Sequence, residues 1–183
     1  MGSRDTATDG EIVRAVLAGD VERYAVLVAR HRDRYARFAA RMLGSLDDAE
    51  DAVQDALVRA FDRLADCREP EKFAGWLFLI LRNRCFAEGR RQKREGRVPE
   101  EAAATVVAPD ISDAGLEQGE RTVALDQAVE LLTPEQRETF LLKHVEELTY
   151  EEIAGLTGAT VASLKMRMHR AYDRLRELMK EHI

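Results

Sequence analysis

The segment that most constrains the fold is 148–176, LTYEEIAGLTGATVASLKMRMHRAYDRLR, which has the pattern of two helices joined by a tight turn. Thr149 followed three residues later by Glu152 is a capping box, which predicts where the first helix begins. The glycines that follow bracket a turn, and Thr160 is placed to cap a second helix. This spacing predicts a helix-turn-helix motif.

The second helix of this motif has two unlike faces. At about 100° per residue its apolar residues share one side, which we expect to face the core. They are Val161, Leu164, Met168, Ala171, Tyr172, Leu175 and Met179. The residues roughly opposite are Ser163, Met166, Arg167, Arg170 and Arg174. Donors on a protruding helix suit the reading of base edges in a DNA major groove, although a solvated amphipathic helix in a bundle would also explain them.

Composition favours an all-α protein. The 183 residues are 45% hydrophobic and 6% aromatic, and helix formers dominate. No apolar run approaches the ~20 residues of a membrane span, and the first residues lack the apolar stretch of a signal peptide. We therefore expect a cytoplasmic protein.

Residues that carry catalysis or bind metals form no recognisable pattern. Cys67 and Cys85 lie far apart and outside any CxxC motif, and the four histidines lack metal-ligand spacing. The glycine motifs of nucleotide-binding proteins and a nucleophile elbow are missing from the sequence. We expect no enzyme activity, metal site or cofactor, and we expect His31 and His144 to be packing residues.

Charge and composition divide the chain into three parts. The net charge of −6 splits into +1 for residues 1–95, −5 for 96–120 and −2 for 121–183. Segment 96–120 also holds two of the four prolines, three glycines and no aromatic residue, which is typical of a flexible linker. Because affinity for duplex DNA comes largely from phosphate neutralisation, the chain alone should bind duplex weakly and act with a partner.

The first domain, 1–95, is predicted to hold four helices. A short helix capped by Asp9 precedes a second that starts at Asp20 and stops at Gly44. Ser45 starts a third, and the fourth follows the loop 66–72. On the second helix the residues expected to face inward are Tyr24, Leu27, Val28, His31, Tyr35, Phe38 and Met42. On the third helix they are Ala49, Ala52, Val53, Ala56, Leu57, Ala60, Phe61 and Leu64. On the fourth helix they are Phe73, Trp76, Leu77, Ile80, Leu81 and Cys85.

The fourth helix ends in a basic run, 82–97, with seven Lys or Arg and two acids. It could be a solvated helix end. However, Trp76, the only tryptophan, lies on the same helix, and cations beside aromatic rings suit single-stranded DNA with unstacked bases.

A resemblance to a known family rests on three segments: DDAEDAVQDALVRAF (47–61), FAGWLFLILRNRC (73–85) and TYEEIAGLTGATVASLKMRMHRA (149–171). Together they resemble bacterial RNA polymerase sigma factors of the extracytoplasmic-function (ECF) group of the sigma-70 family. The resemblance covers nearly the whole chain. It implies a four-helix sigma domain 2 in 1–95 and a helix-turn-helix sigma domain 4 in 121–183, joined by the linker 96–120.

The resemblance also implies roles for individual residues. Those matching the contact with the β′ clamp helices of core RNA polymerase are Asp47, Glu50, Asp51 and Gln54, and the β subunit is a further expected contact. Those matching the part that melts the −10 promoter element are Trp76 and Asn83, with Arg84, Arg90, Arg91 and Arg94 holding phosphates. Those matching the −35 reader are Ser163, Lys165, Met166, Arg167, His169, Arg170 and Arg174. Trp76 is equally expected as a core residue, and Met166 replaces the family's usual small polar residue.

The linker length also bears on function. Promoter elements about 17 base pairs apart are separated by roughly 58 Å, whereas a relaxed 25-residue coil spans only about 25–30 Å. The linker must therefore be held open, which a polymerase scaffold can do. The resemblance further implies an anti-sigma factor as a partner.

Two other readings of the sequence remain. A one-component regulator with a helix-turn-helix output would bind its operator tightly without a partner, which the charge distribution disfavours. A helical adaptor that mimics a sigma factor and sequesters an anti-sigma factor would not need the −35 arginines.

Overall fold

The computed structural model describes residues 6–96 and 124–180, and every regular element in these ranges is a helix, as composition predicts. The chain forms two compact units, which are described separately below. The predicted linker 96–120 lies outside the described residues except for Gly96.

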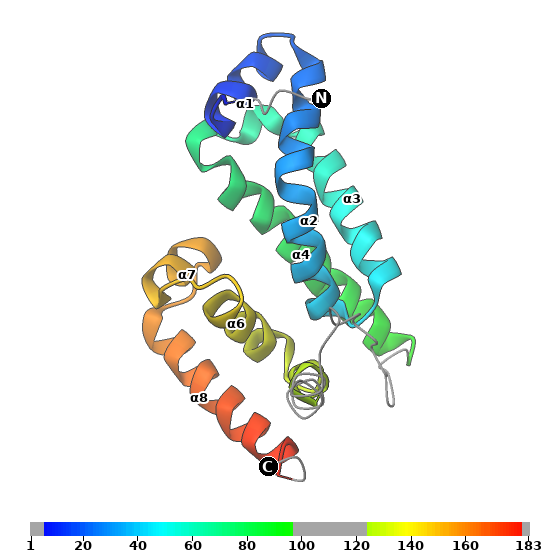
Figure 1. Cartoon of the computed structure of the whole chain (residues 1–183), viewed down its shortest axis with the longest axis vertical. Coiled ribbons are helices and arrows are strands. Elements are labelled where there is room, and N and C mark those ends of the chain that lie inside the picture. Colours follow the sequence, from blue (N-terminus) through cyan, green and yellow to red (C-terminus); the bar gives the residue numbers. More distant parts are fainter. Residues whose placement is uncertain (1–5, 97–123, 181–183) are drawn as a thin grey trace, which may run out of the picture. The chain divides into compact units, whose positions relative to one another are not determined.

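The N-terminal unit is built on three long helices, with a short helix at one end (Figure 1). Its elements are α1 (Asp9–Leu17), η1 (Val21–Arg23), α2 (Tyr24–Leu43), α3 (Leu46–Asp62), η2 (Leu64–Asp66), η3 (Pro70–Lys72) and α4 (Phe73–Arg94). Helix α1 contacts η1 and η3, so it closes the end of the unit where the loop before α4 lies. Gly44, with φ of 66°, ends α2 as the sequence predicts.

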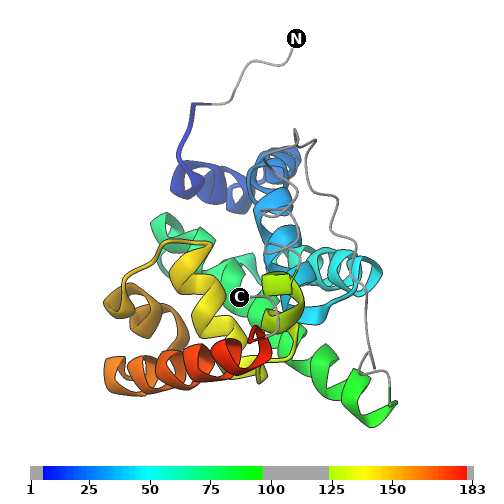
Figure 2. The same cartoon turned by 60° about the horizontal axis from the view of Figure 1, so that its bottom comes forward.

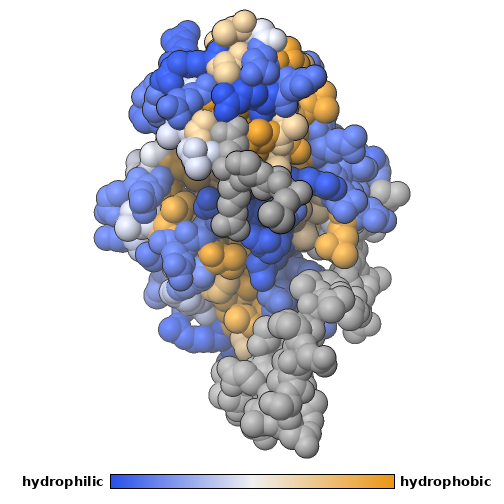
Figure 3. All heavy atoms as spheres, turned by 45° about the horizontal axis from the view of Figure 1, so that its top comes forward, coloured by the Kyte–Doolittle hydropathy of each residue, from blue (hydrophilic) through white to orange (hydrophobic). Residues whose placement is uncertain are grey.

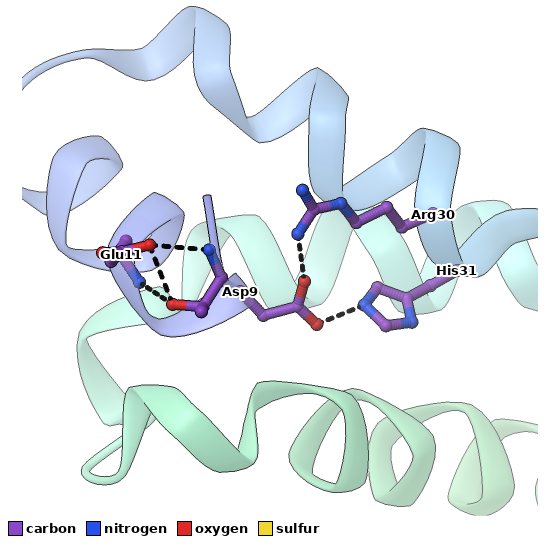
Figure 4. A network of polar contacts seen from close by, with 5 residues as sticks. Asp9, Glu11, Arg30 and His31 are labelled. Carbon is purple, nitrogen blue, oxygen red and sulfur yellow. Dashed lines mark hydrogen bonds and ion pairs between the residues drawn. The ribbon is translucent and has the colours of Figure 1, made fainter. Parts of the chain in front are cut away.

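The cap of α1 differs from the prediction. Thr8, not Asp9, is the N-cap: its Oγ1 accepts from the Glu11 N–H at 3.2 Å, and its own N–H donates to Glu11 Oε2 at 2.7 Å. The carboxylate of Asp9 instead lies 2.9 Å from Arg30 and 2.6 Å from Nε2 of His31 (Figure 4). Threonine followed by glutamate three residues later forms a reciprocal box, which leaves Asp9 available to join α1 to α2.

The start of α2 also differs from the prediction. Asp20 makes no side-chain cap hydrogen bond, and the chain passes through the single turn η1 before α2 begins at Tyr24. The hydroxyl of Tyr24 donates to the Leu57 carbonyl at 2.7 Å, which joins α2 to α3. Burial raises the pKa of Tyr24 to about 12, so this hydroxyl remains a donor at neutral pH.

Small residues on α3 and aromatic residues on α2 and α4 form the core of the N-terminal unit. Four alanines of α3 are buried, as predicted: Ala49, Ala52, Ala56 and Ala60. Two aromatic residues of α4 are buried: Phe73, as predicted, and Phe78, which meets Phe38 edge to face with ring centroids 4.9 Å apart. Trp76, predicted to face inward, is only half-buried. Tyr35 donates its hydroxyl to the Ala74 carbonyl at 2.6 Å, and this hydrogen bond joins α2 to the start of α4.

The C-terminal unit contains the predicted helix-turn-helix. Residues 124–130 are helical, and α6 (Pro134–His144), α7 (Tyr150–Thr157) and α8 (Val161–Leu178) follow. Thr149 and Glu152 form the predicted capping box, Gly158 ends α7 with φ of 74°, and Thr160 caps α8. Helix α6 contacts both helices of the motif, and Figures 1 and 2 show α7 at the N-terminal end of α8.

The centre of the apolar face of α8 packs as the sequence predicts, with Leu164, Met168, Ala171 and Leu175 buried. The prediction is wrong for Tyr172, which is 37% exposed, and Val161 and Met179 are only half-buried at the two ends of the helix. On the face of the molecule seen in Figure 3, hydrophilic side chains predominate and hydrophobic ones lie in small groups. Across residues 6–96 and 124–180, none of the helices combines the length and hydropathy that a membrane span requires.

Candidate nucleic-acid interface

The first half of α8 presents cations that have no acidic partner among the described residues. Lys165 and Arg170 are exposed and Arg167 is half-buried on one flank. Within the described part of the chain, none of these three side chains is paired with a carboxylate. Met166 is 53% exposed beside them, and Ser163 is half-buried with its N–H bonded to Oγ1 of Thr160. The N-terminal half of the second helix is the part that meets base edges in helix-turn-helix proteins.

The second half of α8 uses its basic side chains differently. His169 lies 3.4 Å from Asp173, Arg176 lies 3.1 Å from the same carboxylate, and Arg174 lies 2.8 Å from Glu177. These pairs neutralise the positive charge within one helix. The two halves therefore differ in what they offer to DNA, although the sequence alone gives both a basic face.

Sequence analysis missed one residue, Tyr150, that lies beside α8, the second helix of the helix-turn-helix motif. Tyr150, at the start of α7, has Nζ of Lys143 at 5.4 Å and Nζ of Lys165 at 5.9 Å from its ring centroid. Lys143, at the end of α6, was also missed. The sequence places Tyr150 directly after the Thr149 cap. It does not predict that Lys143 and Lys165 meet the ring of Tyr150, because these three side chains come from three helices.

The predicted −10 residues lie along α4 at different depths. The half-buried Trp76 has its ring centroid 6.1 Å from that of Phe73 at an interplanar angle of 44°, while Asn83 is exposed. Arg90, Arg91 and Arg94 are exposed at the C-terminal end of the helix. Helix α4 therefore carries both a partly exposed aromatic side chain, that of Trp76, and a group of exposed cations.

Arg84 differs from the other predicted −10 residues because it lies between carboxylates. Its Nε is 2.9 Å from Asp55 of α3, and its Nη1 is 3.3 Å from Glu88, which is 1% exposed. Arg59 lies 3.1 Å from the same Asp55. The guanidinium of Arg84 thus joins α4 to α3 inside the domain.

The residues predicted to contact the polymerase share the outward face of α3. Asp47, Glu50, Asp51 and Gln54 are exposed. At about 100° per residue they point away from the buried alanines, and the same face continues to Val58 and Phe61. These two side chains are 53% and 38% exposed, so Phe61, predicted to face inward, lies at the edge of the core, 5.0 Å from the ring of Tyr24.

Two family matches agree with this arrangement. Residues 27–95 match Sigma-70 region 2 and residues 122–175 match Sigma-70, region 4. Over 143 residues the chain is 32% identical to the ECF RNA polymerase sigma factor EcfG of Rhodopseudomonas palustris, covering 78% of this chain and 77% of EcfG. The chain belongs to the ECF group of sigma-70 factors.

Further relatives of this sigma factor include the ECF RNA polymerase sigma factor SigE of Mycolicibacterium smegmatis, 34% identical over 161 residues. That match covers 85% of the present chain but only 61% of SigE. Among solved structures, the sigma factor RpoE in complex with the anti-sigma factor NepR from Bartonella quintana is similar, with a TM-score of 0.62 and 28% identity. The similarity covers 84% of this chain and 94% of that one.

The two matched regions contain all the candidate residues of this sigma factor. The outward face of α3 and the whole of α4 lie in the region 2 match, and the basic half of α8 lies in the region 4 match. Helix α1, which is anchored through Asp9, precedes the region 2 match.

Proposed function

We propose that this sigma factor binds core RNA polymerase and directs promoter-specific initiation, with domain 2 (1–95) melting the −10 element and domain 4 (121–183) reading the −35 element. One observation carries the proposal: a single chain holds two different basic helices, α4 with an aromatic edge and α8 within a helix-turn-helix. The first suits single-stranded DNA and the second suits a duplex. The linker 96–120 connects them.

At the −35 element, Arg170 and Arg167 are proposed to contact bases and Lys165 and Ser163 the flanking phosphates. The availability of Lys165, Arg167 and Arg170 for DNA is supported by the absence of acidic partners for these three cations in the described residues. Met166 is proposed to make apolar contact with the groove. His169 and Arg174 share their charge with Asp173 and Glu177, so we assign them a smaller part in binding.

At the −10 element, Trp76 and Asn83 are proposed to capture an extruded base, while Arg90, Arg91 and Arg94 hold phosphates. Flipping a base costs a few kcal/mol, which stacking and hydrogen bonds must offset. Arg84 is proposed to act through α3 rather than on DNA, because Asp55 and Glu88 already neutralise its guanidinium.

The outward face of α3 is proposed to dock on the β′ clamp helices through Asp47, Glu50, Asp51 and Gln54. Domain 4 is proposed to contact the β subunit. The sigma factor would act in the cytoplasm, where the chromosome is transcribed. An anti-sigma factor is a further proposed partner, supported by the similar RpoE, which was solved in complex with one.

In vitro transcription with core polymerase and a promoter library randomised at both elements tests this proposal. We expect transcripts only when core and sigma factor are both present, and weak binding of duplex by the free protein because the chain is acidic overall. Nanomolar specific binding by the free protein at physiological salt, with no gain on adding core, would favour a one-component regulator instead.

A further inference from the structure

Two lysine side chains from different helices converge on the aromatic ring of Tyr150. Lys143 ends α6, Lys165 lies in the second turn of α8, and Tyr150 begins α7 between them in sequence. Both ammonium groups lie within 6 Å of the ring centroid, at 5.4 and 5.9 Å. At this range a ring attracts a cation, so Tyr150 restrains both lysines at one place on the surface.

Neither ammonium has an acidic partner among the residues that the structure describes. Lys143 donates to the Leu148 carbonyl at 3.1 Å, which fixes its position without neutralising it. The charge of Lys143 acts on Glu152, whose pKa is lowered chiefly by hydrogen bonds from Thr149 and to a smaller extent by this lysine. The carboxylate of Glu152 is occupied by the cap, because both the N–H and the hydroxyl of Thr149 donate to it at 2.8 Å.

Two cations held around one aromatic ring repel each other, and an anion bound beside them offsets this repulsion. On α8, Lys165 lies about 140° around the helix axis from Arg170, so Lys165 is on a flank of the exposed face and not beside the proposed base-contacting arginine. A helix placed in a major groove turns its flanks toward the two sugar-phosphate backbones. The flank with Lys165 is also the flank where the first helix of the motif, α7, would cross the backbone.

We propose that Lys143 and Lys165 form a phosphate clamp on the DNA backbone beside the −35 element, with Tyr150 as the positioning residue that holds both ammonium groups. This inference rests on the proposed function. It adds Lys143 and Tyr150 to the DNA interface. It also gives the clamp a sequence-independent role, since phosphate contacts hold the protein in register without distinguishing bases.

The test measures the affinity of the holoenzyme, at several salt concentrations, for the promoter that a randomised library selects. Lys143→Gln and Lys165→Gln should each weaken binding and reduce the slope of log affinity against log salt by about 0.9, and the double variant by about twice that. The preferred −35 sequence should not change. Arg176→Gln is the matched control, because Arg176 is exposed but paired with Asp173.

The role of Tyr150 is tested separately by two variants. Tyr150→Leu should weaken binding several-fold with thermal stability preserved, and Tyr150→Phe, which keeps the ring, should retain most of the affinity that Tyr150→Leu loses. A wild-type salt slope for Lys143→Gln would overturn the clamp, and a changed base preference would make Lys143 a base contact. If wild-type protein gives no promoter-specific transcription, the proposed function itself fails, whereas normal transcription with an unaltered Lys143→Gln slope rejects the clamp alone.

Discussion

In α4 the guanidinium of Arg84 lies between the carboxylates of Asp55 and Glu88, whereas in α8 the side chain of Arg170 is exposed and has no carboxylate partner in the described part of the chain. Both helices are basic, and the sequence pattern assigned both arginines to DNA. Their surroundings differ because α4 is packed along α3, while the outer face of α8 is open to solvent.

The difference separates charge that holds the fold together from charge that is available to a partner. A buried ion pair is retained only when each group is matched, since an unmatched buried charge is strongly unfavourable. Arg84 meets this condition and joins the helix proposed to dock on polymerase to the helix proposed to bind the −10 strand. Arg170 gains little from its surroundings in the free protein, so its charge remains available for a base edge.

The largest effect is expected from breaking the buried network. Arg84→Met should lower the free energy of unfolding by about 2–3 kcal/mol, because the ion pairs of Arg84 with Asp55 and with the buried Glu88 are both lost. The figure is below that for a fully buried pair because the side chain of Arg84 is 30% exposed. Urea unfolding measures it, and the exposed Arg90→Met serves as control. Equal stability of the two variants would remove the distinction drawn here between Arg84 and its neighbours.

Charge reversal on the outward face of α3 should act on binding and leave the fold intact. The double variant Glu50→Lys, Asp51→Lys should weaken association with core polymerase at least tenfold, about 1.4 kcal/mol. Both positions are exposed, so helical content and unfolding should change little. Competition with wild-type protein for core measures the effect. Undiminished competition by a folded double variant would exclude this face as the docking surface.

The smallest effect is expected from the cap of the helix-turn-helix. The folded pKa of Glu152 lies below its ordinary value of 4.5, first because Thr149 hydrogen-bonds to it. Its contribution to stability is therefore present above pH 4.5 and is lost as the pH falls through the folded pKa. Glu152→Gln should be less stable than wild type at pH 7, and the difference should shrink as the pH falls below 4.5. Thermal unfolding across this pH range measures the difference, and a difference that does not shrink in acid would exclude Glu152 ionisation as the cause.

Local patterns predicted the helical elements well because their signals lie within a few residues. The Thr149 box, Gly158 and the four buried positions of α8 were all visible as short-range spacings. The cap of α1 was assigned wrongly because Thr8 and Asp9 both suit an N-cap. The glutamate at position 11, which decides between them, was overlooked.

Contacts between helices were not predictable in the same way. Periodicity placed Phe73 and Trp76 inward on α4 and did not include Phe78, yet Phe78 is buried against Phe38 while Trp76 is only half-buried. The two partners of Arg84 are Asp55 on α3 and Glu88 one turn further along α4. The sequence does not show that Arg84 and Asp55 are neighbours, because they lie on different helices. The convergence of Lys143, Tyr150 and Lys165 likewise depends on how three helices pack.

The central claim is that the basic side chains of α8 with no acidic partner among the described residues are the ones that contact DNA. The most direct measurement is transcription by reconstituted holoenzyme from a library randomised at −35, with wild type, Arg170→Ala, Lys165→Ala and Arg174→Ala. Arg170→Ala should flatten the preference at one or two positions by roughly 5- to 150-fold, corresponding to about 1–3 kcal/mol for an arginine–guanine contact. Lys165→Ala should lower activity on all sequences alike, and Arg174→Ala should keep the wild-type preference. The account is contradicted if Arg174→Ala changes the preferred sequence while Arg170→Ala leaves it unaltered.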